Sequence, residues 1–256
     1  MGEILDALKR AEEEKRLRQE DMRLFDTRSI RRATGQAEFA KNNGHGPISA
    51  RAVEEYNHLK QSILSRMPDM KSRALVFASA TPGEGNSNVV ANFGIVLASA
   101  GERILLVDAN LREPVLHTLF GVKNDQGMAE LLAGEKTPKQ VMQSTYLPTL
   151  YLVTAGHLPQ NPFPLFASGS IRAILRKMKT DADWILFDAP AVSAFNDAVA
   201  LGPRTDGVVL VVRAEKTRWE VAQSARERLE EGKANILGVV LNDRKFHIPG
   251  WIYRRL

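Results

Sequence analysis

One short stretch of the sequence constrains the fold of this chain more than any other. It comprises residues 78–88, ASATPGEGNSN, between a short apolar run and a segment with helical apolar spacing. A strand, a glycine-rich turn and a helix in this order point backbone N–H groups at phosphates, with a lysine for the phosphate charge and a Ser or Thr hydroxyl for Mg²⁺. Gly83, Gly85 and Ser87 occupy the expected positions, whereas Asn86 occupies that of the lysine. The stretch therefore predicts a phosphate-binding loop without its lysine.

The segments around this loop predict an α/β domain. Apolar runs typical of buried strands lie at 74–78, 104–108, 150–153, 184–190, 207–213 and 236–242. Segments with helical spacing lie at 53–64, 89–100, 115–146 in pieces, 171–178 and 217–231. Strands that alternate with helices predict a P-loop NTPase-type, mainly parallel sheet with helices on both faces.

Four segments are predicted along the chain. Residues 1–24 form an amphipathic helix with a narrow apolar stripe, residues 25–49 a linker, residues 50–245 the P-loop domain, and residues 246–256 a basic aromatic tail. The N-terminal helix could bind a partner or a membrane surface, or pack on its own domain. The tail could touch a membrane or a partner, or dock on the sheet edge.

Composition limits the location and the partners. No run has the apolar length needed to cross a bilayer, and the N-terminus mixes acidic and basic residues, so we expect a cytoplasmic chain. The absence of cysteine excludes disulfides and thiolate chemistry. A net charge of +5 permits contact with anionic lipid or nucleic acid, but there is no basic motif interleaved with aromatic residues, and we predict no nucleic-acid partner.

Polar side chains at strand ends predict a site beside the loop. Asp108 and Asp188 each end an apolar run, and the carboxyl ends of parallel strands meet at one edge of a sheet. Together with Ser87 they could surround Mg²⁺, while the backbone of residues 83–87 holds phosphates. Asn242, which ends the last apolar run, is placed to read the nucleotide base.

The order of these motifs resembles the bacterial tyrosine kinases of capsule and exopolysaccharide biosynthesis, a deviant-Walker class of P-loop ATPases. The resemblance spans about residues 50–245. Thr81–Gly85 is similar to the start of the Walker A loop, Ile104–Arg112 to the Walker A′ strand with its Asp-x-Asp-x-Arg ending, and Ile185–Pro190 to Walker B. Similar residues also recur at Asp197-Ala198, Asp206-Gly207 and 238–242.

The resemblance implies particular cofactors, residues and partners. The cofactors are ATP or ADP with Mg²⁺, and Asp108, Asn110 and Arg112 fall at catalytic positions. The nucleotide-binding positions are Pro82, Gly83, Glu84, Gly85, Asn86, Ser87, Asn88 and Asn242. The implied partner is an inner-membrane polysaccharide co-polymerase or export complex, through which the chain would lie at the membrane. Family members phosphorylate tyrosines in their own C-terminal tails.

The loop and the Walker A′ strand depart from this family where turnover depends on them. Asn86 replaces the lysine, and losing a charge-assisted contact with phosphate costs on the order of 2–5 kcal/mol. Asn88 replaces the usual Thr beside Ser87. Asn110 replaces the second carboxylate of Walker A′, and an amide has no basic site that accepts a tyrosine proton near neutral pH.

Two further departures concern assembly and the tail. The family's interface motif Glu-x-x-Arg-x-x-Arg corresponds to Glu54, Asn57 and Lys60, so both arginines are altered in a possible homo-oligomer. The tail has a single tyrosine, Tyr253, in place of a cluster.

These departures favour one of three hypotheses. The leading one is a pseudokinase or very weak kinase that regulates the membrane complex by binding. The second is an active autokinase that phosphorylates Tyr253, and the third is a nucleotide-free structural adaptor. Asn86 and Asn110 are the residues that discriminate between them.

Overall fold

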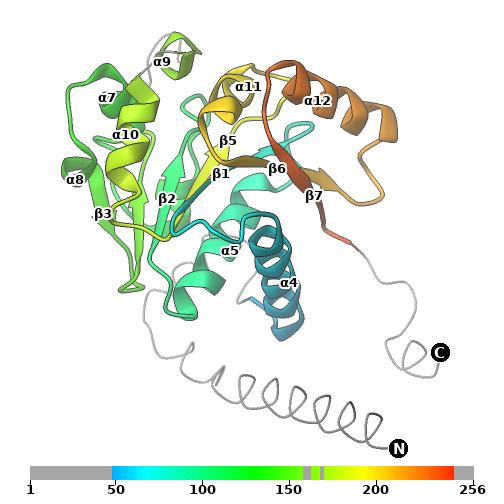
Figure 1. Ribbon diagram of the computed structural model, residues 1–256, viewed down its shortest axis with the longest axis horizontal. Helices are drawn as coiled ribbons and strands as arrows, with labels where there is room; N and C mark the ends of the chain where they lie inside the picture. Colours follow the sequence, from blue (N-terminus) through cyan, green and yellow to red (C-terminus); the bar gives the residue numbers. More distant parts are fainter. Residues whose placement is uncertain (1–47, 158–162, 168–169, 245–256) are drawn as a thin grey trace, which may run out of the picture.

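The computed structural model describes residues 48–157, 163–167 and 170–244 (Figure 1). The predicted N-terminal helix at 1–24, nearly all of the linker, the tail at 246–256 and Tyr253 lie outside the described residues.

A seven-stranded sheet forms the centre of the molecule, in the order β3-β4-β2-β5-β1-β6-β7. All pairs are parallel except β3 with β4. The strands are β1 Arg73–Ser79, β2 Ile104–Asp108, β3 Met142–Ser144, β4 Leu150–Val153, β5 Trp184–Ala189, β6 Gly207–Arg213 and β7 Ile236–Asn242. The mainly parallel sheet predicted from the apolar runs is confirmed.

Helices cover both faces of this sheet (Figure 1). One face is covered by α4 Ala50–Arg66, α5 Asn86–Ser99 and α6 Leu116–Phe120. The other face is covered by α7 Met128–Ala133, α8 Pro138–Val141, α9 Phe163–Ala167, α10 Ser170–Met178, α11 Asp197–Leu201 and α12 Trp219–Glu231, with a 3₁₀ turn at Gly202–Arg204. Because both faces are buried, the central strands read as unbroken apolar runs.

The segment at 115–146 differs from its prediction in part. It does contain short helices, α6, α7 and α8, but Met142–Ser144 is the edge strand β3. These three residues are half-buried or exposed, so they carry no apolar run. Their pairing with β4 overrides a weak local pattern.

Helix α5 is held against the sheet by an aromatic cluster below the phosphate-loop position. The Phe93 ring lies 5.8 Å from that of Phe77, 5.9 Å from that of Trp184 and 6.1 Å from that of Tyr56, centroid to centroid. Phe93 itself is fully buried. These contacts fix the helix that begins at Asn86, and with it the loop in front of it.

None of the helices within the described ranges combines the length and the apolar character that a bilayer crossing requires.

Gly127 is expected to be irreplaceable for steric reasons. A Cβ at this position would lie 1.9 Å from the carbonyl oxygen of Thr154, which belongs to the backbone and has little room to move. We expect Gly127→Ala to lower the free energy of unfolding by about 1–3 kcal/mol in urea denaturation. Gly238→Ala is the matched control, since its Cβ would meet nothing within 4 Å. Equal stability of the two variants would contradict the close approach of the Gly127 and Thr154 backbones.

Candidate nucleotide-binding site

The predicted phosphate loop connects β1 to α5. Gly83 and Gly85 have φ angles of +80° and +82°, in the left-handed region that favours glycine, and α5 begins directly after Gly85. A cleft of about 380 Å³ lies over the loop and the ends of β2 and β5. It is lined by loop residues, by Asn110 and by Asp188. The structure thus brings the sequence-predicted loop and strand ends together.

Asn86, at the lysine position, points its amide nitrogen into the end of the sheet. Nδ2 donates to Asp188 Oδ1 at 2.6 Å, to the carbonyl oxygen of Phe77 at 2.9 Å and to that of Ala189 at 3.1 Å. The residue is buried, with 8% of its surface exposed. Two N–H bonds already face three acceptors, so no donor of this side chain is left for a phosphate.

Asp188, near the end of β5, is the acceptor at the centre of this arrangement. It is 1% exposed, and Ser87 also hydrogen-bonds to it. Burial raises the pKa of Asp188 to about 6, and the hydrogen bonds from Ser87 and Asn86 only partly oppose this effect. Its second oxygen, Oδ2, is buried without a hydrogen-bond partner, as is Oδ1 of Asn86. A buried orphan oxygen beside a hydroxyl is a donor set that suits a hard cation.

Asp108, predicted as a third metal ligand, has its oxygens committed elsewhere. It lies beside Asp188 in the sheet register, as the sequence predicts. However, Oδ1 accepts from the backbone N–H of Asn110, and Oδ2 accepts from those of Val115 and Leu116, at 3.0–3.2 Å. Burial first, and the charge of Asp188 second, raise the pKa of Asp108 well above its usual range, against these three bonds.

The predicted triad is therefore brought together only in part. Ser87 and Asp188 are in contact, whereas Asp108 fixes the backbone that leads into α6. Among the described residues there is no cluster of three or more His, Cys, Asp or Glu side chains that could hold a metal. A cation here would depend on Ser87 and Asp188, with water as further ligand.

Glu84 and Asn242 hold the loop in place through hydrogen bonds. The Glu84 carboxylate accepts from the backbone N–H of Thr81 at 2.9 Å and from the hydroxyl of Thr217. Asn242, predicted to read a base, donates from Nδ2 to the carbonyl oxygen of Glu84 at 2.8 Å. Its side chain is thus engaged with the loop backbone. The contact between Glu84 and Thr217 was not predicted, because 133 positions separate them in the sequence.

Asn110 and Arg112, the two other residues at Walker A′ positions, also make contacts within the chain. Asn110 Oδ1 accepts from the backbone N–H of Glu113 at 3.2 Å. Arg112 Nε pairs with Oδ2 of the buried Asp197 at 3.1 Å, and its guanidinium lies 4.2 Å from the centroid of the Phe195 ring. Arg112 is therefore held beside the cleft and does not line it.

The cleft is acidic. Its lining residues include Glu84, Glu113 and Asp188, and no lysine or arginine of the described part of the chain is among them. The only positive charge that phosphates would meet from these lining residues is the partial charge of backbone N–H groups and of the positive end of the α5 dipole.

The three predicted interface residues lie on α4. Lys60 Nζ pairs with Glu102 of the same chain at 2.6 Å, and the two side chains are 18% and 29% exposed. Asn57 is half-buried and Glu54 is exposed. An ion pair within the chain thus occupies the position of the family's second arginine.

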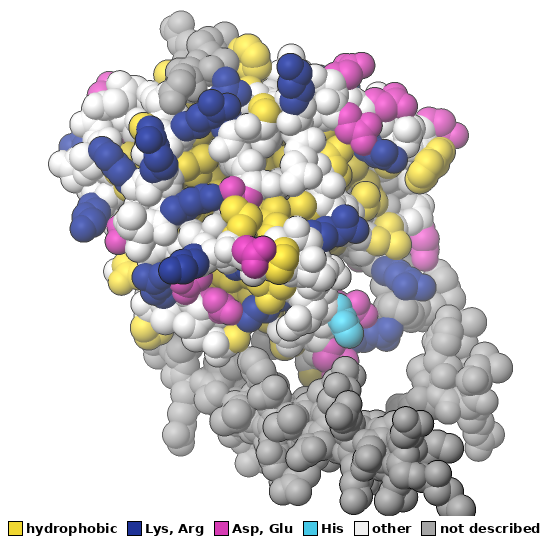
Figure 2. All heavy atoms as spheres, in the orientation of Figure 1, with side chains coloured by type: hydrophobic (Ala, Val, Ile, Leu, Met, Phe, Trp, Pro, Cys, Tyr) yellow, Lys and Arg dark blue, Asp and Glu magenta, His cyan; other side chains and the backbone are white. Residues whose placement is uncertain are grey.

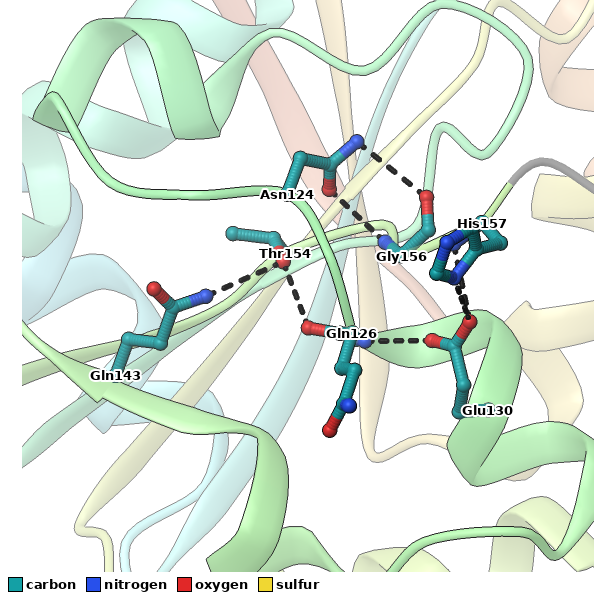
Figure 3. A network of polar contacts seen from close by, with 8 residues as sticks. Asn124, Gln126, Glu130, Gln143, Thr154, Gly156 and His157 are labelled. Atoms are coloured by element: carbon teal, nitrogen blue, oxygen red, sulfur yellow. Dashed lines mark hydrogen bonds and ion pairs between the residues drawn. The ribbon is translucent and has the colours of Figure 1, made fainter.

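A second polar cluster, which sequence reasoning missed, lies where β4 ends (Figure 3). Glu130 accepts from the backbone N–H of Gly127 at 2.6 Å and from both the backbone N–H and Nδ1 of His157, at 3.1 and 2.9 Å. Burial alone would raise the pKa of Glu130, but these hydrogen bonds outweigh it and lower the pKa. Asn124 bonds both backbone groups of Gly156. These contacts tie the segment before α7 to the segment after β4, so the cluster is structural.

Comparisons with known proteins identify the family. Residues 72–234 match the family model described as "Cellulose biosynthesis protein BcsQ". Tyrosine-protein kinase YwqD of Bacillus subtilis is 34% identical over 192 residues, which cover 75% of this chain and 81% of that protein. The chain belongs to the bacterial tyrosine-kinase family of P-loop proteins. This finding confirms the resemblance derived from the motifs.

Other members of this tyrosine-kinase family extend the comparison. The putative tyrosine-protein kinase EpsB of Ralstonia nicotianae is 31% identical over 191 residues, and the chain spans only 25% of its length. Among solved structures, the kinase domain of Escherichia coli tyrosine kinase ETK matches with a TM-score of 0.71 and 28% identity, covering 77% of this chain and 79% of that one. The chimerical protein CapA2B2 matches with a TM-score of 0.71, 29% identity and coverages of 77% and 87%.

The buried Asp188 is expected to make stability fall as pH rises. Its folded-state pKa of about 6 lies above its ordinary value of 3.8, so the folded protein binds more protons between these pH values and loses stability across them. Asp188→Asn removes this loss. We expect the stability of the variant relative to the wild type to rise by about 2 kcal/mol between pH 4.5 and 7.5 in urea denaturation.

The control for this experiment is Asp125→Asn, at an exposed position outside the cleft. Its pH profile should run parallel to that of the wild type. A parallel profile for Asp188→Asn as well would show that Asp188 is not held in the buried state described.

Proposed function

We propose that this member of the tyrosine-kinase family is a pseudokinase or very weak kinase that acts by binding. The observation that carries the proposal is the inward-facing amide of Asn86, which bonds Asp188 and two carbonyl oxygens of the sheet. In this position it supplies no charge to a phosphate. Losing such a charge-assisted contact costs on the order of 2–5 kcal/mol, which is roughly a 30- to several-thousand-fold loss of affinity for the phosphate.

The cleft retains parts that fit ADP or ATP with Mg²⁺. Backbone N–H groups of the glycine loop and the start of α5 are arranged for phosphate oxygens. Ser87 and the unpaired Oδ2 of Asp188 are the groups that would hold Mg²⁺. When bound, the metal supplies positive charge against the phosphates in a cleft whose described lining has no cationic side chain.

The side chains that would transfer a phosphoryl group to a tyrosine are either replaced or engaged within the chain. Asn110 has no basic site for the tyrosine proton. Asp108 is committed to three backbone N–H groups, and Arg112 is paired with Asp197. Asp108 and Arg112 therefore stabilise the walls of the cleft. The chain retains a pocket for a nucleotide, and its role is to bind the nucleotide or to signal through that binding.

The family supports a role in capsule or exopolysaccharide biosynthesis. We infer that the chain is cytoplasmic and regulates an inner-membrane polysaccharide co-polymerase or export complex, through which it associates with the membrane. A homo-oligomer through Glu54, Asn57 and Lys60 of α4 belongs to the same proposal, although Lys60 is already paired with Glu102.

One alternative is favoured by a specific observation. The acidic lining of the cleft disfavours phosphate, which supports a nucleotide-free structural adaptor as the second candidate. An active autokinase that phosphorylates Tyr253 is the third.

Incubation with Mg-ATP is expected to yield no phosphotyrosine above background, by immunoblot and mass spectrometry.

Weak binding of Mg-ADP, with a Kd of about 1 mM, is expected in calorimetry, because the lysine contact is lost. Thermal-shift assays measure the same binding, since a ligand at 100 times its Kd stabilises by about 2.7 kcal/mol. Robust labelling of Tyr253 would overturn the pseudokinase proposal, and no binding at any concentration would favour the adaptor.

Restoring the missing groups is expected to recover affinity. Asn86→Lys combined with Asn110→Asp should tighten Mg-ADP binding at least tenfold in calorimetry, because the new ammonium group supplies the missing charge. Asn86→Met is the matched control, since it removes the inward hydrogen bonds without adding a charge. If the methionine variant gained as much affinity as the lysine variant, the lost charge would not be the cause of weak binding.

A further inference from the structure

A basic surface lies on the helical face that carries α7 to α12, away from the nucleotide cleft. Helix α10 directs Ile171, Ile174, Leu175 and Met178 into the core. Its opposite side presents Arg172, Arg176 and Lys177, all exposed. Figure 2 shows dark blue side chains gathered over this part of the molecule, where α8 and α10 lie in Figure 1.

Helix α8 and the residues before it form the second wall of a groove. The groove has a volume of about 640 Å³, and its lining includes Pro138 and Lys139 on one side and Arg176, Lys177 and Asp181 on the other. Lys136 lies just before α8 and is half-buried. None of the residues that line the nucleotide cleft lines this groove.

The cations of the groove are unpaired, unlike others on the same domain. Arg103 pairs with Asp183, and Lys179 pairs with Asp206, each at 2.6 Å. Lys139, Arg176 and Lys177 line the groove, and Lys136 and Arg172 lie beside it in the sequence. Within the described ranges, by contrast, no ion pair or hydrogen bond engages the charged groups of these five side chains. The nearby carboxylates are Asp181 and Glu135, both exposed, so the groove keeps an excess of positive charge.

We propose that this basic groove binds the surface of a bilayer that contains anionic phospholipids, through the phosphates of their headgroups. Clusters of four to eight Lys or Arg residues on an amphipathic helix are typical of such binding. Here α10 carries Arg172, Arg176 and Lys177, and Lys136 and Lys139 lie in and just before α8. The lining residues include no aromatic side chain on which a nucleic-acid base would stack. The same chain thus presents an acidic cleft where its family binds nucleotide and a basic groove where phosphate is attracted.

Lipid contact of this kind places the domain at the membrane directly. It requires no nucleotide, because the groove and the cleft share no residue. The groove would therefore retain lipid affinity whether or not the cleft is occupied.

The test is co-sedimentation of the full chain with vesicles of phosphatidylcholine alone or with about 30 mol % phosphatidylglycerol. We expect binding to the anionic vesicles only, and its loss at high salt, because headgroup attraction is screened. The groove variant Arg172→Gln/Arg176→Gln/Lys177→Gln is expected to bind roughly 100-fold more weakly, from about fivefold per cation removed. Circular dichroism confirms that the variant is folded.

The matched control is Lys71→Gln/Lys123→Gln/Lys216→Gln, which removes the same net charge at exposed positions outside the groove. It should bind anionic vesicles nearly as tightly as the wild type. Three results of the vesicle assay would overturn the proposal. They are an equal loss in the control, unchanged binding by the groove variant, and no preference of the wild type for anionic vesicles. Binding of the wild type to single-stranded nucleic acid, in place of vesicles, would also overturn it.

Discussion

The hydrogen bond between Asn86 and Asp188 is the interaction on which the site depends. It joins the first residue of α5 to the end of β5, at 2.6 Å, between two buried side chains. A lysine at this position would carry its charge out to a phosphate, whereas the shorter amide reaches only back to β1 and β5. The loop keeps its two left-handed glycines, but the Asn86 side chain bonds to the sheet and does not face a phosphate.

The cleft and the groove carry charge of opposite sign. With Asn86 turned inward and Arg112 paired with Asp197, nothing in the described lining of the cleft balances Asp188. Burial therefore holds the pKa of Asp188 near 6, and Mg²⁺ becomes the natural source of positive charge there. The unpaired cations of the groove lie instead on α10 and around α8, where a membrane surface can reach them.

Much of this fold could be predicted from the sequence, and the reasons are physical. Strands buried on both faces must be apolar throughout, so β1, β2, β5 and β6 were visible as runs. The edge strand β3 has three residues and none of them is buried, so it carries no apolar run and was missed. The meeting of Asp108 with Asp188 followed from parallel strand ends, whereas the commitment of Asp108 to the α6 backbone depends on loop geometry that no spacing encodes.

A crystal structure of the chain grown with Mg-ADP would show whether the Asn86 side chain stays turned into the sheet when a nucleotide is present. We expect Nδ2 of Asn86 to stay within hydrogen-bond distance of Asp188 and of the Phe77 carbonyl, with any phosphate held by loop N–H groups and by a cation on Ser87 and Asp188. An Asn86 side chain turned outward, with Nδ2 bonded to a phosphate oxygen and Asp188 released, would contradict it.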